Sequence, residues 1–123
     1  MKIERVKFEE FPGGIVKASV SGCRYDAMDK INGKFVATTT SAIEFGSNVW
    51  SKAHKHYIMN DTYSAIARCA PEDEYNFEVG KKIAMKKLND KYHRSLDRRI
   101  VRFKNDVTKM LQNVEQYFEY KNI

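Results

Sequence analysis

Four arginines in the C-terminal third of the chain are the residues whose type and spacing best fit a binding function. Arg98 and Arg102 are four residues apart, so a helix places them on one face, with Arg94 just ahead of them and Arg99 beside them. A guanidinium group is a planar fork that can hold a phosphate through two hydrogen bonds. The arginines therefore predict a phosphate-bearing ligand, and the alternative is a solvated helix face balanced by acidic residues.

Aromatic side chains that can stack on a nucleotide base precede these arginines in the sequence. They are Tyr75, Phe77 and Tyr92, and stacking on aromatic rings is a common way for proteins to hold bases. Phe77 falls on the helix face that should pack, whereas Tyr75 and Tyr92 border the helix and are freer to stack. For all three rings, a place in the core is the alternative.

Metal binding and catalysis are less well supported. His54 and His56 would project to the same face of a strand and could bind zinc with Cys69 or His93. The sequence contains no CxxC pair and no HExxH motif, so paired strand histidines that pack or face solvent are the better interpretation. It also lacks a GxSxG elbow and a Walker-type loop. We therefore expect no metal, no cofactor and no enzymatic activity.

The overall charge agrees with an anionic partner. The chain of 123 residues has 22 Lys and Arg against 16 Asp and Glu, a formal net charge of +6. Such an excess favours an anionic partner or serves solubility. It is concentrated in residues 91–104, whereas residues 1–50 are nearly neutral. The basic average argues against an acidic protein that mimics DNA.

Length and composition also bound the fold and the compartment. A chain of this size is expected to form one domain over residues 1–123, mainly β in residues 1–70 and helical in residues 76–120. Cys23 and Cys69 occur in a chain whose first residues form no apolar signal segment, which predicts a reducing cytoplasm. No apolar run approaches the ~20 residues that span a bilayer, so no membrane partner is expected.

Turn signals and alternating apolar residues predict an antiparallel sheet before residue 71. The Phe-Pro-Gly-Gly turn at residues 11–14 should close a hairpin, and Asn-Gly at residues 32–33 favours another hairpin with a type I′ turn. Between these turns, Tyr25, Met28 and Ile31 can share one face of a short helix. The expected strands cover residues 3–8, 15–20, 34–40, 50–59 and 62–68.

Two helices are expected after the sheet. Asn76 is a candidate N-cap for the first, with acidic residues ahead of it and lysines behind it, and Ser95 is a candidate N-cap for the second. The apolar residues of the second helix follow the four-three spacing of a heptad seam: Leu96, Ile100, Phe103, Val107, Met110, Val114 and Tyr117. The expected fold is therefore α+β, an antiparallel sheet of four to six strands followed by two C-terminal helices. The heptad seam also predicts a homo-oligomer, a dimer or higher.

The expected joint between the last strand and the first helix carries a motif. Its strand ends in Ala-x-Cys-x-Pro-x-Asp, and an aromatic residue and a helix with small residues follow. The matching residues are Ala67, Cys69, Pro71, Asp73, Tyr75, Phe77, Gly80 and Ala84. Residues 65–92 thereby resemble the phage anti-Thoeris sponge proteins of the first type, which bind and sequester a cyclic ADP-ribose-derived immune signal.

The resemblance implies paired subunits with the ligand held at their interface by arginines one turn apart on the C-terminal helix, by an aromatic residue and by an amide. In this chain Arg98 and Arg102 match the arginines, Phe77 the aromatic residue and Asn89 the amide. The candidate ligand-binding residues are Arg98, Arg102, Phe77, Asn89, Arg99 and Tyr92.

Together with the basic cluster, this resemblance implies a phage or prophage protein that sequesters a cyclic nucleotide immune signal in the bacterial cytoplasm without cleaving it. The alternative is a small basic nucleic-acid-binding phage protein. A nucleic acid requires a basic surface that contacts several phosphates, and its affinity falls steeply as salt rises. A closed pocket for a small ligand should depend on salt much less.

Overall fold

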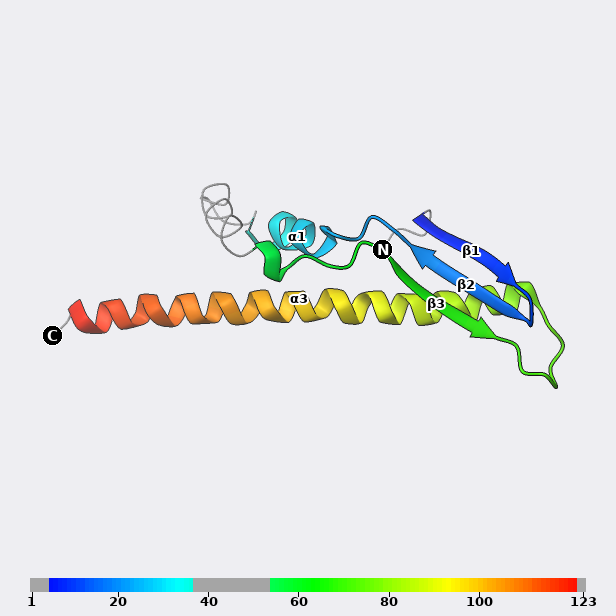
Figure 1. Ribbon diagram of the computed structural model, residues 1–123. Coiled ribbons are helices and arrows are strands. Elements are labelled where there is room, and N and C mark those ends of the chain that lie inside the picture. Colours follow the sequence, from blue (N-terminus) through cyan, green and yellow to red (C-terminus); the bar gives the residue numbers. More distant parts are fainter. Residues whose placement is uncertain (1–4, 37–53, 122–123) are drawn as a thin grey trace. The chain divides into compact units, whose positions relative to one another are not determined.

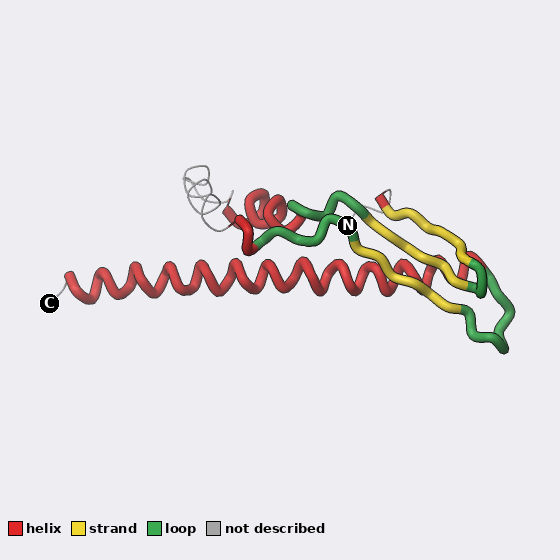
Figure 2. The backbone as a smooth tube through the Cα atoms, viewed as in Figure 1, coloured by secondary structure: helices red, strands yellow, loops and turns green. Residues whose placement is uncertain are grey.

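The computed structural model describes residues 5–36 and 54–121 of the chain. The fold is α+β: a three-stranded antiparallel sheet, a short helix and a long C-terminal helix (Figures 1 and 2). The chain divides into two compact units. The first, called the sheet unit, lies within Met1–Asp26 and Met59–Leu96, and the second unit lies within Ala27–Ile58 and Asp97–Ile123.

The sheet consists of β1 (Val6–Phe11), β2 (Ile15–Val20) and β3 (Tyr63–Arg68), with β2 in the centre. The expected hairpin at residues 11–14 is confirmed, because Gly13 and Gly14 adopt φ of +88° and +72° in the turn between β1 and β2. Such positive φ angles are readily available to glycine. The predicted strand at residues 62–68 is also confirmed, as β3.

The core of the sheet unit lies between one face of the sheet and the N-terminal part of α3 (Phe77–Lys121), where the helix comes into contact with β2. Val16, Ala18 and Val20 alternate along β2 and are buried, as a strand with one covered face requires. Leu88 and Tyr92 are buried on α3 at four-residue spacing. The sheet and helix patterns of the sequence therefore meet in one core.

The expected break between two C-terminal helices does not exist, because α3 is continuous through Ser95. Ser95 is buried, and its hydroxyl shares a hydrogen bond with the hydroxyl of Tyr63 on β3. The serine is therefore not an N-cap: its side chain is bonded to a neighbouring element. Asn76, in contrast, is the N-cap that was expected, since its Oδ1 accepts hydrogen bonds from the backbone N–H groups of Glu78 and Val79.

Two other sequence predictions are wrong. The Asn-Gly dipeptide does not close a hairpin, because Gly33 does not have the positive φ that a type I′ turn requires. Instead, residues Ile31–Val36 form a π-helical segment, η2. This segment follows the short helix α1 (Asp26–Lys30), which was expected. The fully buried side chain of Ile31 anchors this helical path. The strand predicted for residues 50–59 is replaced at His54–His56 by a 3-10 turn, η3. The remainder of the strand predicted at residues 34–40, and residues 50–53, lie outside the described residues.

In the part of the chain that the structure describes, no helix combines the length and the apolar character needed to cross a membrane. α3 is long, but charged residues occur throughout it.

A polar cluster crosses the sheet unit beside the core. The carboxylate of Asp26, the first residue of α1, accepts hydrogen bonds at Oδ2 from Arg5 Nη2 at 3.0 Å and from the Tyr92 hydroxyl at 2.8 Å. Arg5 also donates to the Gly22 carbonyl, and the backbone N–H of Cys23 donates to the carbonyl of Asp61. These bonds join segments that are distant in the sequence.

The free energy of unfolding should fall at alkaline pH because of two buried tyrosines. Burial and the bond to Asp26 raise the pKa of Tyr92, and burial and the bond to Asp106 raise the pKa of Tyr57. Each raised pKa means that the folded chain keeps a proton that the unfolded chain loses above pH ~10. Stability should therefore be unchanged by these groups below pH ~10 and fall by about 1 kcal/mol per tyrosine between pH 10 and 11.

Urea unfolding at pH 8, 10 and 11 measures this effect. Tyr92→Phe should reduce the alkaline loss, whereas Tyr120→Phe is the matched control because the side chain of Tyr120 is 78% exposed. An equally steep alkaline loss in wild-type protein and in Tyr92→Phe would contradict the assignment to Tyr92.

Candidate functional site

The candidate site lies on the part of α3 that belongs to the second unit. Arg98 and Arg102 lie one turn apart on this helix, as the sequence predicted, and both are exposed. Within the described residues, neither guanidinium group lies within ion-pair distance of a carboxylate. Asn105 and Lys109 continue the same helix face at spacings of three and four residues, and both are exposed. We call Arg98, Arg102, Asn105 and Lys109 the arginine strip.

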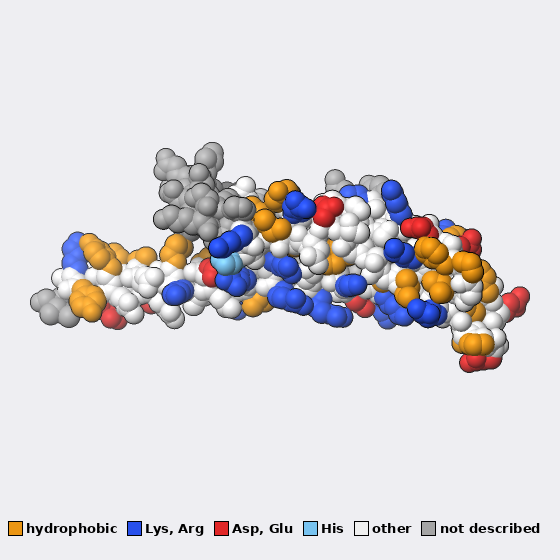
Figure 3. Space-filling view, in the orientation of Figure 1, with side chains coloured by type: hydrophobic (Ala, Val, Ile, Leu, Met, Phe, Trp, Pro, Cys, Tyr) orange, Lys and Arg blue, Asp and Glu red, His pale blue; other side chains and the backbone are white. Residues whose placement is uncertain are grey.

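Contacts of neighbouring residues hold the same helix segment in place. Phe103 stacks against Phe35 at a ring-centroid distance of 6.1 Å and meets the edge of Tyr57 at 6.0 Å. The hydroxyl of Tyr57 donates to Asp106, and Arg99 Nε donates to the Ile58 carbonyl at 3.3 Å. The helix is therefore packed through these residues, and the side chains of the arginine strip remain open to solvent. Lys and Arg side chains gather along α3 in Figure 3.

The other predicted site residues have different surroundings. Arg99 is half-buried and bonded to the backbone, so it positions the helix. The expectation that Tyr92 is free to stack is wrong: its side chain is 3% exposed, contacts Tyr63 edge-on and donates its hydroxyl to Asp26. Phe77 is half-buried, and the Lys81 ammonium group lies 4.5 Å from its ring centroid.

Asn89 is exposed and lines an open groove of about 450 Å³ on the sheet unit, together with Phe8, Met85 and three lysines. Phe77, Asn89 and Tyr92 thus belong to the sheet unit, while Arg98, Arg99 and Arg102 belong to the second unit.

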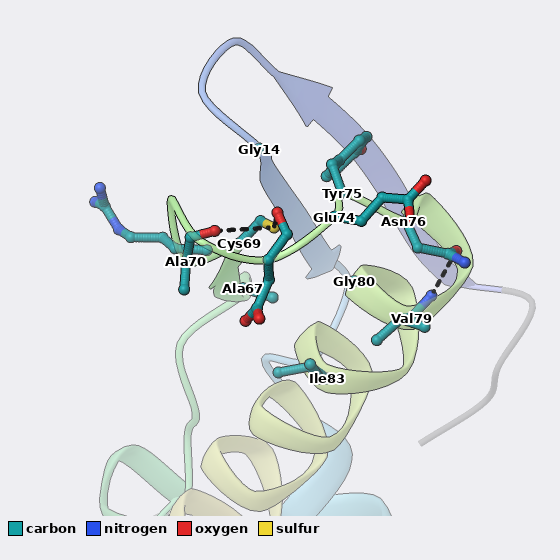
Figure 4. Close-up of a pocket in the computed structure, with 12 residues that line it drawn as sticks. Gly14, Ala67, Cys69, Ala70, Glu74, Tyr75, Asn76, Val79, Gly80 and Ile83 are labelled. Atoms are coloured by element: carbon teal, nitrogen blue, oxygen red, sulfur yellow. Dashed lines mark hydrogen bonds between the residues drawn. The ribbon is translucent and has the colours of Figure 1, made fainter.

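The motif at the strand-to-helix joint forms a cleft of about 410 Å³ in the sheet unit (Figure 4). Five motif residues line it: Ala67, Cys69, Asp73, Tyr75 and Gly80. Val79, Gly80 and Ile83 come from α3, and the others come from β3 and the loop that follows, apart from Gly14 in the β1–β2 turn.

The polar groups of this cleft are largely engaged with the protein. The Tyr75 hydroxyl donates to Glu10 at 2.7 Å, and the Cys69 thiol donates to the carbonyls of Ala70 and Asp73 at 3.5 Å. Cys69 is half-buried. Asp73 and Glu74 outweigh the single positive charge of Arg68 in the lining of the cleft, so the cleft is poorly suited to a phosphate.

Two lysines that contact the sheet were not singled out by sequence reasoning. Lys87 and Lys91 are one turn apart on α3, and their Nζ atoms donate to the carbonyls of Ile66 and Ser64 on β3. Their four-residue spacing on a predicted helix was a signal that both lysines lie on one helix face. The strand that they contact, however, depends on the tertiary fold.

No group of three or more His, Cys, Asp or Glu side chains in residues 5–36 and 54–121 is arranged to hold a metal ion. His56 is exposed in η3, and the side chain of His54 is outside the described part.

Comparisons of the chain with models of protein families, with curated proteins and with solved structures found no match. The resemblance of residues 65–92 to the sponge proteins therefore stays a prediction.

Proposed function

We propose that the protein is a non-enzymatic nucleic-acid-binding protein that contacts phosphates through the arginine strip. One observation carries the proposal: Arg98 and Arg102 extend from one face of a packed helix, without a carboxylate at ion-pair distance among the described residues. Guanidinium groups so placed are available to phosphate oxygens. The formal net charge of +6 also favours approach of a polyanion.

The openness of the strip favours a polymer over a small ligand. Sites for small molecules usually enclose most of the ligand surface. Neither arginine lines any of the three clefts described in residues 5–36 and 54–121. A nucleic acid needs no enclosure, because it gains affinity from several phosphates and from the release of their counterions.

Binding of a fluorescent 20-nucleotide single strand, followed by anisotropy at 50–300 mM salt, tests the proposal. Three cations of the strip predict a slope of log K against log salt of roughly −2. Arg102→Ala should weaken binding and bring the slope closer to zero by about 0.7. Lys104→Ala is the matched control, because it removes the same charge two residues away, on a different face of α3.

Equal losses from Arg102→Ala and Lys104→Ala would show that only net charge matters, and would contradict a site at the strip. The absence of oligonucleotide binding at 50 mM salt would contradict nucleic-acid binding itself.

The second candidate function is the sponge: sequestration of a cyclic ADP-ribose-type signal in the bacterial cytoplasm. A different observation favours it. After the arginines, α3 has an exposed apolar stripe at heptad spacing, in which Met110, Val114 and Tyr117 are 38%, 47% and 59% exposed. A second copy of the chain paired along this stripe could enclose a ligand at Arg98 and Arg102, which an isolated helix face cannot do.

Light scattering and calorimetry with cyclic ADP-ribose distinguish the two functions. The sponge predicts a dimer or a larger assembly, a heat of binding that changes little with salt, and recovery of unaltered ligand after heat denaturation. Arg102→Lys should abolish this binding because the fork is lost, but it should preserve most nucleic-acid binding because the charge remains. Oligonucleotide binding together with no heat from the cyclic nucleotide would rule out the sponge.

A further inference from the structure

The outer edge of β3 in the sheet unit has a polar groove beside it. Among the described strands, β3 pairs on one side only, with β2. The backbone N–H of Cys69 donates to the Gly14 carbonyl at 2.8 Å, so the alternating residues Ala67, Ala65 and Tyr63 direct their backbone groups toward β2. By the same alternation, the backbone groups of Ser64, Ile66 and Arg68 point away from β2. They form the free edge of β3.

α3 contributes three cations to this edge. Lys91 Nζ donates to the Ser64 carbonyl at 3.0 Å, and Lys87 Nζ donates to the Ile66 carbonyl at 3.4 Å. Together with Arg94 they line a groove of about 520 Å³ between β3 and α3. Among the described residues that line the groove, these three cations face one acidic residue, Asp90. The net charge of the groove is therefore positive.

The two kinds of edge group are not equally satisfied. The outward carbonyls of Ser64 and Ile66 accept bonds from lysine side chains. The outward N–H groups of Ser64, Ile66 and Arg68 have no partner within the described residues. A strand edge in this condition can still pair with another extended chain, provided that this chain displaces the lysines.

We propose that the free edge of β3 binds an extended acidic peptide as an added strand. The peptide carbonyls accept from the N–H groups of Ser64 and Ile66, and its own N–H groups replace the ammonium groups at the carbonyls. Its carboxylates then bind Lys87, Lys91 and Arg94. The inference does not rest on the arginine strip, whose residues lie in the second unit.

Charge complementarity selects the acidic peptide over other strands. Lysines at a strand edge normally discourage pairing, because an apolar strand would displace them without offering a new partner. Carboxylates do offer one, and a charge-assisted hydrogen bond is stronger than the lysine–carbonyl bond that it replaces. Since side chains alternate along a strand, carboxylates at every second position would lie on the side of the lysines.

The probe is a fluorescent peptide, acetyl-Glu-Thr-Glu-Val-Glu-Thr-Glu-amide, and binding to the full chain is measured by anisotropy. A peptide of the same composition with its four glutamates in succession is the control, and should bind at least tenfold more weakly. Lys87→Gln combined with Lys91→Gln should weaken the first peptide at least tenfold. Lys86→Gln, at an exposed lysine that lines a different groove, should leave binding unchanged.

Ile66→Pro tests the backbone bonds, because proline removes an edge N–H that takes no part in the β2–β3 ladder. Binding should fall at least tenfold, while Ile66→Val should retain it. If Ile66→Pro does not fold, two N-methylated probes replace it. One is methylated at the odd-numbered peptide residues and the other at the even-numbered residues. The probe whose methyl groups face β3 should lose binding to the wild-type protein.

Three results would overturn the proposal. They are no binding of the alternating peptide at 100 µM protein, equal binding of both peptides, and retention of binding by Ile66→Pro or by both N-methylated probes. If a single-stranded oligonucleotide displaces the peptide and is itself weakened by Lys87→Gln with Lys91→Gln but not by Ile66→Pro, the groove is a polyanion site and the peptide assignment is wrong.

Discussion

Asp26→Ala should lower the free energy of unfolding by about 2 to 3 kcal/mol, because one carboxylate accepts two hydrogen bonds in the polar cluster of the sheet unit. One donor is the Tyr92 hydroxyl, on a side chain that is 3% exposed, and the other is the charged group of Arg5. Alanine leaves both donors without this acceptor. Part of the arginine and of the aspartate faces solvent, so water should offset part of the loss.

Urea unfolding of three variants separates the hydrogen bonds from other effects. Asp26→Asn keeps an acceptor oxygen but loses the charge, so its loss should be smaller. Asp29→Ala is the matched control, because Asp29 is exposed on the same helix α1. A loss from Asp29→Ala equal to that from Asp26→Ala would assign the effect to negative charge at α1, and would contradict the role of the bonds to Arg5 and Tyr92.

The parts of the fold that the sequence predicts correctly depend on local signals. The Pro-Gly-Gly turn specifies the β1–β2 hairpin through residues that adopt its turn geometry. Asn76 caps α3 through bonds to residues two and three positions later. The helical spacing of Arg98 and Arg102 likewise needs only the regular geometry of α3. In each case the partners lie within a few residues of one another.

The parts that could not be predicted depend on partners far away in the sequence. Ser95 has the residue type of a helix cap, yet its hydroxyl is bonded to Tyr63, 32 residues earlier, and α3 continues through it. Tyr92 was expected to be free for a base, but its partner is Asp26, 66 residues earlier. The contacts of Lys87 and Lys91 with β3 belong to the same class. Local patterns contain no information on such pairs.

Gly80→Ala should lower the free energy of unfolding by about 1 to 2 kcal/mol, although alanine favours helices. Gly80 lies near the start of α3, where the helix packs closely against β2. A Cβ atom added at this position would lie only 2.6 Å from Val16 Cγ2. Val16 is 1% exposed on the central strand and has a β-branched side chain, so it has little room to move. Helix and strand would have to separate, at the expense of packing in the core.

Gly33→Ala is the matched control for this effect. Gly33 is also helical, lies in Ile31–Val36 and lacks a left-handed φ, and a Cβ atom added to it would meet no described atom within 4 Å. Alanine there should stabilise the chain by about 0.4 to 1 kcal/mol, since it restricts the unfolded state without a clash. The two substitutions therefore should change stability in opposite directions in the same urea titration. Stabilisation by Gly80→Ala would mean that α3 and β2 are not in close contact at Val16, and the packing assigned to the sheet unit would be wrong.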